Sequence, residues 1–134
     1  MDEFIVKMIL DNKQEIMTAN QRIHHIVRAN KTRNLREKSK LLHRGCPKFE
    51  RAKLTIWLSF PDKRKRDVLN YANTGKALVD GAIPYILDDD SNKYLPIIDY
   101  RMSNHRSAAG TVGVTMRWER RPADFEIESE PEGF

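Results

Sequence analysis

Carboxylate, amide and ammonium side chains that can bind a metal ion or a phosphate gather between residues 67 and 90. They are Asp67, Asn70, Lys76, Asp80 and the run Asp88, Asp89 and Asp90. Lys76 and Asp80 are four residues apart and share one face of the helix expected there. The end of the preceding strand and the turn after this helix can bring Asp67 close to Asp89 or Asp90. Converging carboxylates repel one another, and oxygen-only ligands favour Mg²⁺ or Mn²⁺, so the stretch predicts a metal site.

Such a site has a clear chemical use on a polyanion. A bound Mg²⁺ polarises a phosphodiester, helps to form hydroxide from water and stabilises the leaving oxygen. Lys76 can then offset the negative charge that develops on the phosphorus group. The alternative interpretation is that the aspartate run is only a solvated turn, for which aspartate is a common residue.

The charge of the chain is unevenly distributed. Lysine and arginine number 24 against 19 acids, but five of the acids lie in residues 122–134, which leaves 24 bases against 14 acids in residues 1–121. Between Arg22 and Arg66 there are 15 bases and only three acids. This block predicts a polyanionic partner, in particular nucleic acid, although a solvated basic helix face is the ordinary alternative. The acidic segment 122–134, which contains two prolines, is expected to be a flexible tail.

Length and composition indicate one compact domain. The chain has 134 residues, of which 40% are hydrophobic and 32% charged, which argues against both disorder and a membrane protein. A single cysteine, Cys46, excludes an internal disulfide and a cysteine-based zinc cluster. The four histidines show no ligand spacing, so a zinc site is not expected. We expect a cytoplasmic protein without a membrane partner, because the N-terminus lacks the apolar run of a signal peptide.

Hydrophobic periodicity predicts four strands and two helices in the order β, α, β, α, β, β. The strands are expected over residues 4–10, 54–60, 94–102 and 111–119, and the helices over 31–44 and from about Thr74 to 83. Asn30 is the expected cap of the first helix, and Leu35, Leu41 and Leu42 its apolar stripe. The fold class is therefore α/β or α+β: a small mixed sheet with two packed helices, in a domain of residues 1–121.

The segment 60–95, FPDKRKRDVLNYANTGKALVDGAIPYILDDDSNKYL, resembles the RusA-type Holliday junction resolvases, which are crossover junction endodeoxyribonucleases common in phages and prophages. In that family a basic run precedes an Asp-x-Asp-Asn element, a helix carries Lys-x-x-x-Asp, and an Asp-Asp pair follows. The upstream segment TANQRIHHIVRANKTRNLREKSK also resembles the N-terminal loop and first helix of phage members. The resemblance extends over roughly residues 4–119.

The resemblance implies a homodimer that binds four-way DNA junctions and cuts paired strands symmetrically with Mg²⁺ in DNA recombination and repair. Asp67 matches the first metal-binding aspartate, Asp90 the aspartate after the helix, and Lys76 the helix lysine. Asn70 and Asp80 match the motif asparagine and the second helix acid. The implied DNA contacts are Arg22 in the N-terminal loop, the basic run Lys63, Arg64, Lys65 and Arg66, and Lys76.

One position departs from the family pattern. Leu69 stands where the middle aspartate is expected, and a leucine cannot bind a metal ion. Asn70, Asp89 or Asp80 can supply a substitute ligand. The alternative is a protein that keeps the scaffold and binds junction or duplex DNA with weak or no cleavage. A more remote alternative is a small RNA-binding protein.

Overall fold

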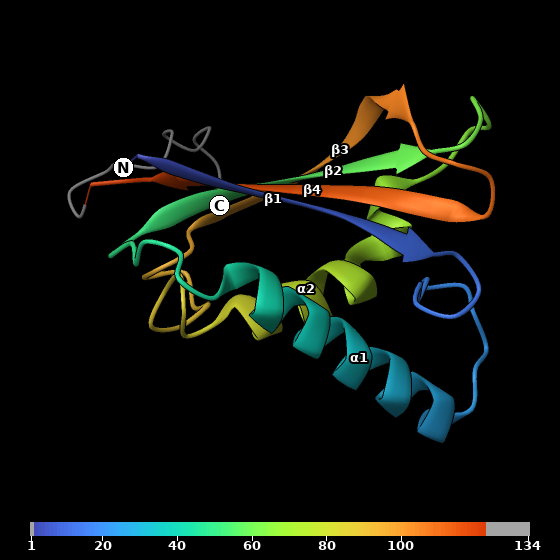
Figure 1. Cartoon of the computed structure of the whole chain (residues 1–134), viewed down its shortest axis with the longest axis horizontal. Coiled ribbons are helices and arrows are strands. Elements are labelled where there is room, and N and C mark those ends of the chain that lie inside the picture. The colour runs from blue at the N-terminus through green and yellow to red at the C-terminus, as the bar shows by residue number, and fades with distance from the viewer. Residues whose placement is uncertain (1, 123–134) are drawn as a thin grey trace, which may run out of the picture.

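A four-stranded sheet with two helices on one of its faces makes up the protein (Figure 1). The computed structural model describes residues 2–122. Its elements are β1 (Glu3–Asp11), α1 (His25–His43), β2 (Ala52–Phe60), the 3-10 helix η1 (Val68–Tyr71), α2 (Ala72–Ala82), β3 (Ile97–Arg106) and β4 (Thr111–Arg120). The predicted α+β class and element order are confirmed. The predicted acidic tail lies outside the described residues except for Pro122.

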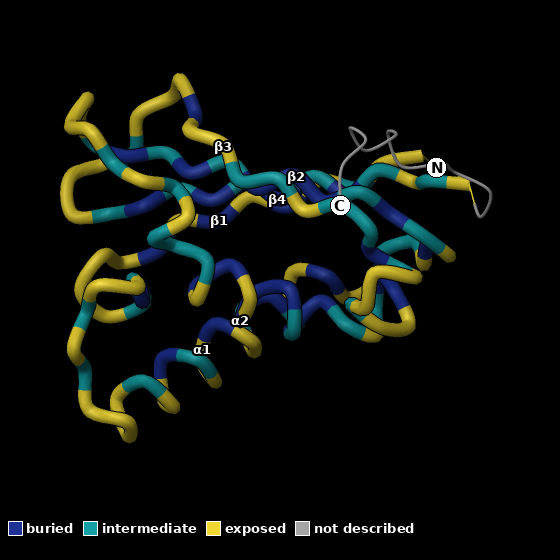
Figure 2. Tube along the Cα trace, turned by 180° about the vertical axis from the view of Figure 1, so that it is seen from behind, coloured by how far each residue is buried: buried dark blue, intermediate teal, exposed yellow. Residues whose placement is uncertain are grey.

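The strand order across the sheet is β1, β4, β2, β3. β4 pairs antiparallel with both β1 and β2, whereas β2 and β3 are parallel. Alternate residues of β1 and β4 are buried, among them Val6, Leu10, Val114 and Trp118, because only one face of the sheet is covered by helices. Figure 2 shows this alternation along the strands and the more continuous burial of β2.

Helix α1 begins earlier than the sequence predicts. It starts at His25, where the imidazole of His24 accepts a hydrogen bond from the amide of Ile26, so the predicted cap Asn30 is wrong. The predicted apolar stripe is also wrong in part, because Leu41 and Leu42 are exposed. The buried side of α1 instead follows one row of residues spaced four apart: Lys31, Leu35, Ser39 and His43.

His43 connects α1 to the sheet through both ring nitrogens. Trp118 Nε1 donates to His43 Nε2 at 3.0 Å, and His43 Nδ1 donates to the Ser39 carbonyl oxygen at 2.8 Å. The indole N–H is a donor only, so Nε2 must be unprotonated. Burial lowers the pKa of the fully buried His43, which keeps the imidazole neutral.

Helix α2 is preceded by η1 and packs closely against α1 and β3. The predicted start near Thr74 is two residues late, and η1 was not predicted. A Cβ on Gly81 would lie 2.3 Å from the carbonyl oxygen of Arg36, and a Cβ on Gly75 would lie 2.2 Å from the Tyr100 hydroxyl. These two glycines therefore allow the close contact of α2 with its neighbours.

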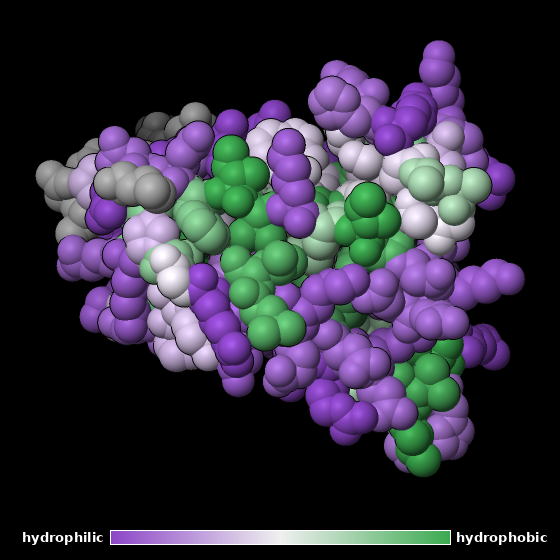
Figure 3. All heavy atoms as spheres, viewed as in Figure 1, coloured by the Kyte–Doolittle hydropathy of each residue, from purple (hydrophilic) through white to green (hydrophobic). Residues whose placement is uncertain are grey.

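Strand β3 begins at Ile97, three residues later than predicted, directly after Pro96. A proline lacks the N–H that the strand pairing needs, which accounts for the later start. No helix within residues 2–122 is long and apolar enough to cross a membrane. Exposed apolar side chains nevertheless occur, at Ile5 and Ile9 of β1 and at Ile26 and Val27 of α1. Figure 3 shows apolar surface along β1 and at the start of α1.

Candidate functional site

Lys76, Asp80 and Asp90 form a compact charged cluster on the outer side of α2. Lys76 Nζ donates to Asp80 Oδ1 at 2.7 Å, one helical turn away, and also to Asp90 Oδ2 in the turn that follows α2. The carboxyl of Asp80 also pairs with Arg36 of α1 at 3.4 Å. The structure thus joins three of the predicted site residues in one contact group.

Hydrogen bonds within this cluster favour the charged forms of Lys76 and Asp90. Hydrogen bonds to Asp80 first, and then to Asp90, raise the pKa of Lys76. The hydrogen bond from Lys76 lowers the pKa of Asp90. Two carboxylates therefore share one ammonium ion, and all three groups are partly open to solvent. This is a pair of carboxylates next to an ammonium group, a set of groups that suits the chemistry of a phosphate ester or a divalent metal.

Asp67 lies at the start of η1, in a hollow that none of the three cluster residues lines. Its carboxylate accepts a hydrogen bond from the Leu69 amide at 3.0 Å and so caps η1. The hollow has a volume of about 410 Å³, and its lining includes Asn20, Lys65, Asp67 and Asn70. The chain around residue 19 is held there because the Ala19 amide donates to the Asn70 carbonyl oxygen at 2.9 Å. The N-terminal loop and the basic run, remote in sequence, therefore meet at Asp67.

The two parts of the candidate site are linked by the start of α2. Lys76 follows Asp67 by nine positions, and the helical rise of η1 and α2 over them is at most about 16 Å. Within residues 2–122, no three His, Cys, Asp or Glu side chains are placed so that they could hold one metal ion. The predicted joint ligation by Asp67 and Asp90 stays a prediction.

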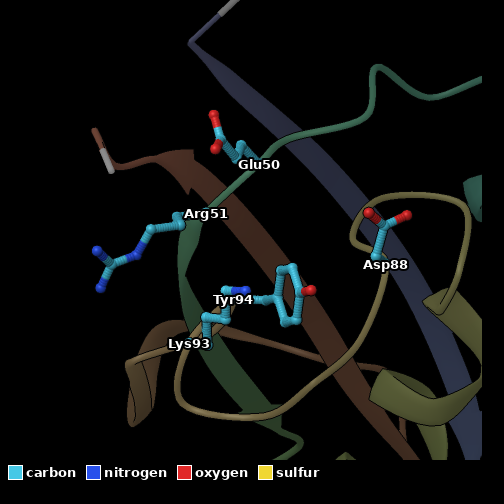
Figure 4. A pocket seen from close by; sticks show the side chains of 5 residues that line it. All are labelled: Glu50, Arg51, Asp88, Lys93 and Tyr94. Carbon is cyan, nitrogen blue, oxygen red and sulfur yellow. The ribbon is translucent and has the colours of Figure 1, made fainter. Parts of the chain in front are cut away.

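The three aspartates of the run 88–90 do not act together. Asp88 pairs with Lys48 and lines a hollow of about 410 Å³ with Glu50, Arg51, Lys93 and Tyr94 (Figure 4). Asp89 is exposed, and Asp90 is the member that contacts Lys76. The run is therefore split between two contact groups, and the role of Asp90 as a metal ligand stays a prediction.

The basic residues predicted to contact DNA differ in whether other side chains hold them in place. Arg22, Lys63, Arg64 and Lys65 are exposed on loops. Arg66 is different, because its guanidinium lies 4.3 Å from the centre of the Phe60 ring and donates to Asp62 at 2.8 Å. That hydrogen bond lowers the pKa of Asp62. Arg66 thus orders the loop before Asp67, and its contact with a phosphate stays a prediction.

Sequence reasoning missed two residues next to the cluster. Arg36 reaches Asp80 from α1, and Tyr100 of β3 lies against Gly75, one residue before Lys76. Burial raises the pKa of the Tyr100 hydroxyl, while the charge of Lys76 opposes that rise. Neither residue belongs to a local motif, so only the packing of α1 and β3 against α2 identifies them.

No family model and no curated protein matches this sequence. The resemblance to RusA-type resolvases therefore depends on the order of the motif residues and on the layout of the chain around them.

Proposed function

We propose that the protein is a Mg²⁺-dependent endodeoxyribonuclease that binds branched DNA and cuts it, in the manner of the RusA-type resolvases it resembles. The observation that carries the proposal is the contact of Lys76 with both Asp80 and Asp90. Asp67, nine positions before Lys76 in the chain, lies in a hollow that Lys65 and Arg66 also line. The sequence places all four residues at matching positions of the family motif, apart from the replacement of the middle aspartate by Leu69.

Asp90 and Asp67 are the proposed metal ligands, with Asp89, Asn70 or Asp80 as the further oxygen donor. The donor chemistry fits Mg²⁺ or Mn²⁺, because every candidate group offers oxygen only. The metal would supply Lewis-acid activation of the scissile phosphate. Lys76, released from its shared position between two carboxylates, would donate to a phosphate oxygen and stabilise its charge. Asp67 lies in a separate hollow, so joint ligation requires η1 to approach Asp90 when DNA binds.

The exposed basic residues around the Asp67 hollow are proposed to bind the DNA. Lys63, Arg64 and Lys65 protrude from the loop before η1, and Arg22 follows the N-terminal loop that contacts Asn70. Phosphate contacts of this kind position a nucleic acid without reading its sequence. Recognition of four-way junctions by shape, with two copies of the chain cutting symmetrically, agrees with such contacts.

One observation favours a second candidate function, which is junction or duplex binding without efficient cleavage. Leu69 is 64% exposed at the position where the family has its middle aspartate. A solvent-facing apolar side chain there supplies no metal ligand. The two functions share the basic surface and differ only in whether the phosphodiester is cut.

A labelled four-way junction separates the two candidates. We expect wild-type protein to bind it with or without Mg²⁺ and to cut it only with Mg²⁺ or Mn²⁺. Asp90→Asn should bind at least as tightly, since it removes a negative charge, but cut at least about 100-fold more slowly. Asp88→Asn is the matched control, because it removes the same charge from the same turn but from the Lys48 pair.

Three results decide between the candidates. Binding without any cutting by the wild type would refute the endonuclease and favour the binding protein. Equal cutting by Asp90→Asn and Asp88→Asn would exclude Asp90 as a ligand. A protein that sediments as a monomer, alone and with the junction, would contradict symmetric cleavage by two copies.

A further inference from the structure

The face of the sheet opposite the helices forms a surface of its own. Both helices cover the other face, as Figure 1 shows, and α2 carries Lys76 on that covered side. Strand register places Lys7 of β1, Thr115 of β4, Trp57 of β2 and Arg101 of β3 in one row across the open face. An aromatic ring therefore lies in the middle of the sheet, and a basic side chain stands at each end of its row.

Trp57 is the centre of this row. The Arg117 guanidinium lies 4.9 Å from the centre of its ring, a cation–π contact that fixes the ring from one side. Trp57 also lines a hollow of about 290 Å³ with Lys7, His105 and Thr115. The indole is half-buried, so part of it stays open to that hollow.

Small residues extend the hollow into a trough. The next row towards the carboxyl end of β2 contains Gly113 and Ser59, and a Cβ on Gly113 would lie 3.1 Å from Ser59 Cβ. A second hollow of about 520 Å³ there is lined by residues including Lys7, Ser59, Gly113 and Arg106. The two hollows share Lys7 and Thr115, so they are neighbours on this face, and together they are called the trough.

The charge of the trough has one sign. Within the described chain, neither hollow has an Asp or Glu among its lining residues, whereas Lys7, His105 and Arg106 line it. Of the acids that strand alternation places on this face, Asp99 pairs with Lys53 and Arg101 at 3.6 Å each, and Glu119 with Arg117 at 3.0 Å. Glu3 is the register partner of Glu119, and Asp11 at the end of β1 accepts hydrogen bonds from the amides of residues 13 and 14. The trough is therefore complementary to a narrow polyanion.

We propose that this open face binds a single strand of DNA, with a base stacked on Trp57 and the phosphates next to Lys7 and Arg106. An aromatic ring on a sheet, flanked by basic side chains, is an arrangement that binds unpaired nucleotides. A duplex keeps its bases stacked inside and cannot offer one to Trp57. The surface lies on the opposite side of the sheet from the Lys76 cluster, so it adds a second contact beyond the proposed cleavage site.

Trp57 supplies the reporter for the test. The chain has two tryptophans, and Trp118 is fully buried, so a short oligothymidine should quench the fluorescence of Trp57 alone. We expect Trp57→Leu to weaken binding about tenfold or more, measured by anisotropy of the labelled oligomer, and Trp57→Phe to retain most of it. Lys7→Gln should weaken binding and reduce the salt dependence. Lys53→Gln, on the same face but paired with Asp99, is the matched control and should bind as the wild type does.

The outcomes separate this proposal from the endonuclease. Asp90→Asn should bind the oligothymidine like the wild type; if the wild type binds it but cuts no junction, only the proposed cleavage fails. Wild-type affinity for the oligothymidine in folded Trp57→Leu, or a loss of duplex affinity in Trp57→Leu as large as its loss of single-strand affinity, would overturn the proposal. A dimer in the wild type that dissociates in Trp57→Leu would also overturn it, because the face would then be covered by a second copy.

Discussion

Mild acid should destabilise the fold through one residue, the buried imidazole of His43. Its Nε2 accepts a hydrogen bond from the Trp118 indole N–H at 3.0 Å. A proton on Nε2 would place two N–H donors face to face without an acceptor. Burial lowers the pKa of His43 in the folded protein below the ordinary value of 6.5, which applies to the unfolded chain. Below that value the unfolded state binds a proton that the folded state does not, so stability is complete above about pH 6.5 and falls as the pH decreases towards the folded pKa.

The size of the effect follows from a single proton. The free energy of unfolding falls by at most about 1.4 kcal/mol per pH unit, and only below about pH 6.5. Acidification from about pH 7.5 to about pH 5.5 should therefore lower it by at most about 1.4 kcal/mol through this residue. Carboxylates add their own pH dependence, so a comparison with a variant is needed. His43→Leu removes the titrating group but leaves the Trp118 N–H without its acceptor, which should cost about 1–3 kcal/mol at neutral pH.

Urea denaturation at the two pH values measures this difference. We expect the free energy of unfolding of the wild type to fall more on acidification than that of His43→Leu. His105→Leu, which changes an exposed histidine and leaves the hydrogen bond between His43 and Trp118 intact, is the control. If wild type and His43→Leu lose the same stability, the buried hydrogen bond to Trp118 does not hold the imidazole neutral and the reasoning is refuted.

Other consequences of the packing and charge can be measured with the same protein. Gly81→Ala should cost about 1–3 kcal/mol in urea denaturation, because the added Cβ would lie 2.3 Å from the Arg36 carbonyl oxygen; an unchanged midpoint would show that α1 and α2 can separate freely. Leu35→Ala should cost about 2–5 kcal/mol and Leu41→Ala less than about 0.5, and equal losses would contradict the orientation of α1. The affinity for junction DNA should fall steeply between about 50 and about 200 mM salt, and a salt-independent affinity would argue against the phosphate contacts.

The strands could be predicted from the sequence because their alternation is strong. Val112, Val114, Met116 and Trp118 alternate with polar residues, and β4 was predicted to within one residue at its end. Helix α1 could not be placed as well, because its buried row contains a lysine, a serine and a histidine. Lys31 is tolerated there since its ammonium donates to the carbonyl oxygens of residues 13 and 16 at 2.8 and 3.0 Å. Such partners come from the folded chain and leave no periodic signal.

The candidate site was predictable only where residues share a helix. The Lys76 and Asp80 contact follows from their spacing of four, and the contact of Asp90 agrees with the motif order. The separation of Asp88 from Asp90, the position of Arg36 and the capping role of Asp67 depend on loops and on helix packing, which no local pattern specifies. The alternation of β2 places Trp57 opposite the buried Ile56 and Leu58, but the neighbours of Trp57 across the sheet, Lys7 and Arg101, depend on strand pairing, which no local pattern specifies.

The central claim is that Asp67 and Asp90 serve one metal centre. Its most direct test compares the rates at which Asp67→Asn, Asp90→Asn and the double variant cut a four-way junction. The rates are measured in Mn²⁺ under single-turnover conditions. Ligands that act as a unit give strongly non-additive losses. We therefore expect each single variant to lose most of the activity and the double variant to be no slower than the slower single one. Wild-type cutting by Asp67→Asn, or losses that multiply in the double variant, would contradict a shared centre.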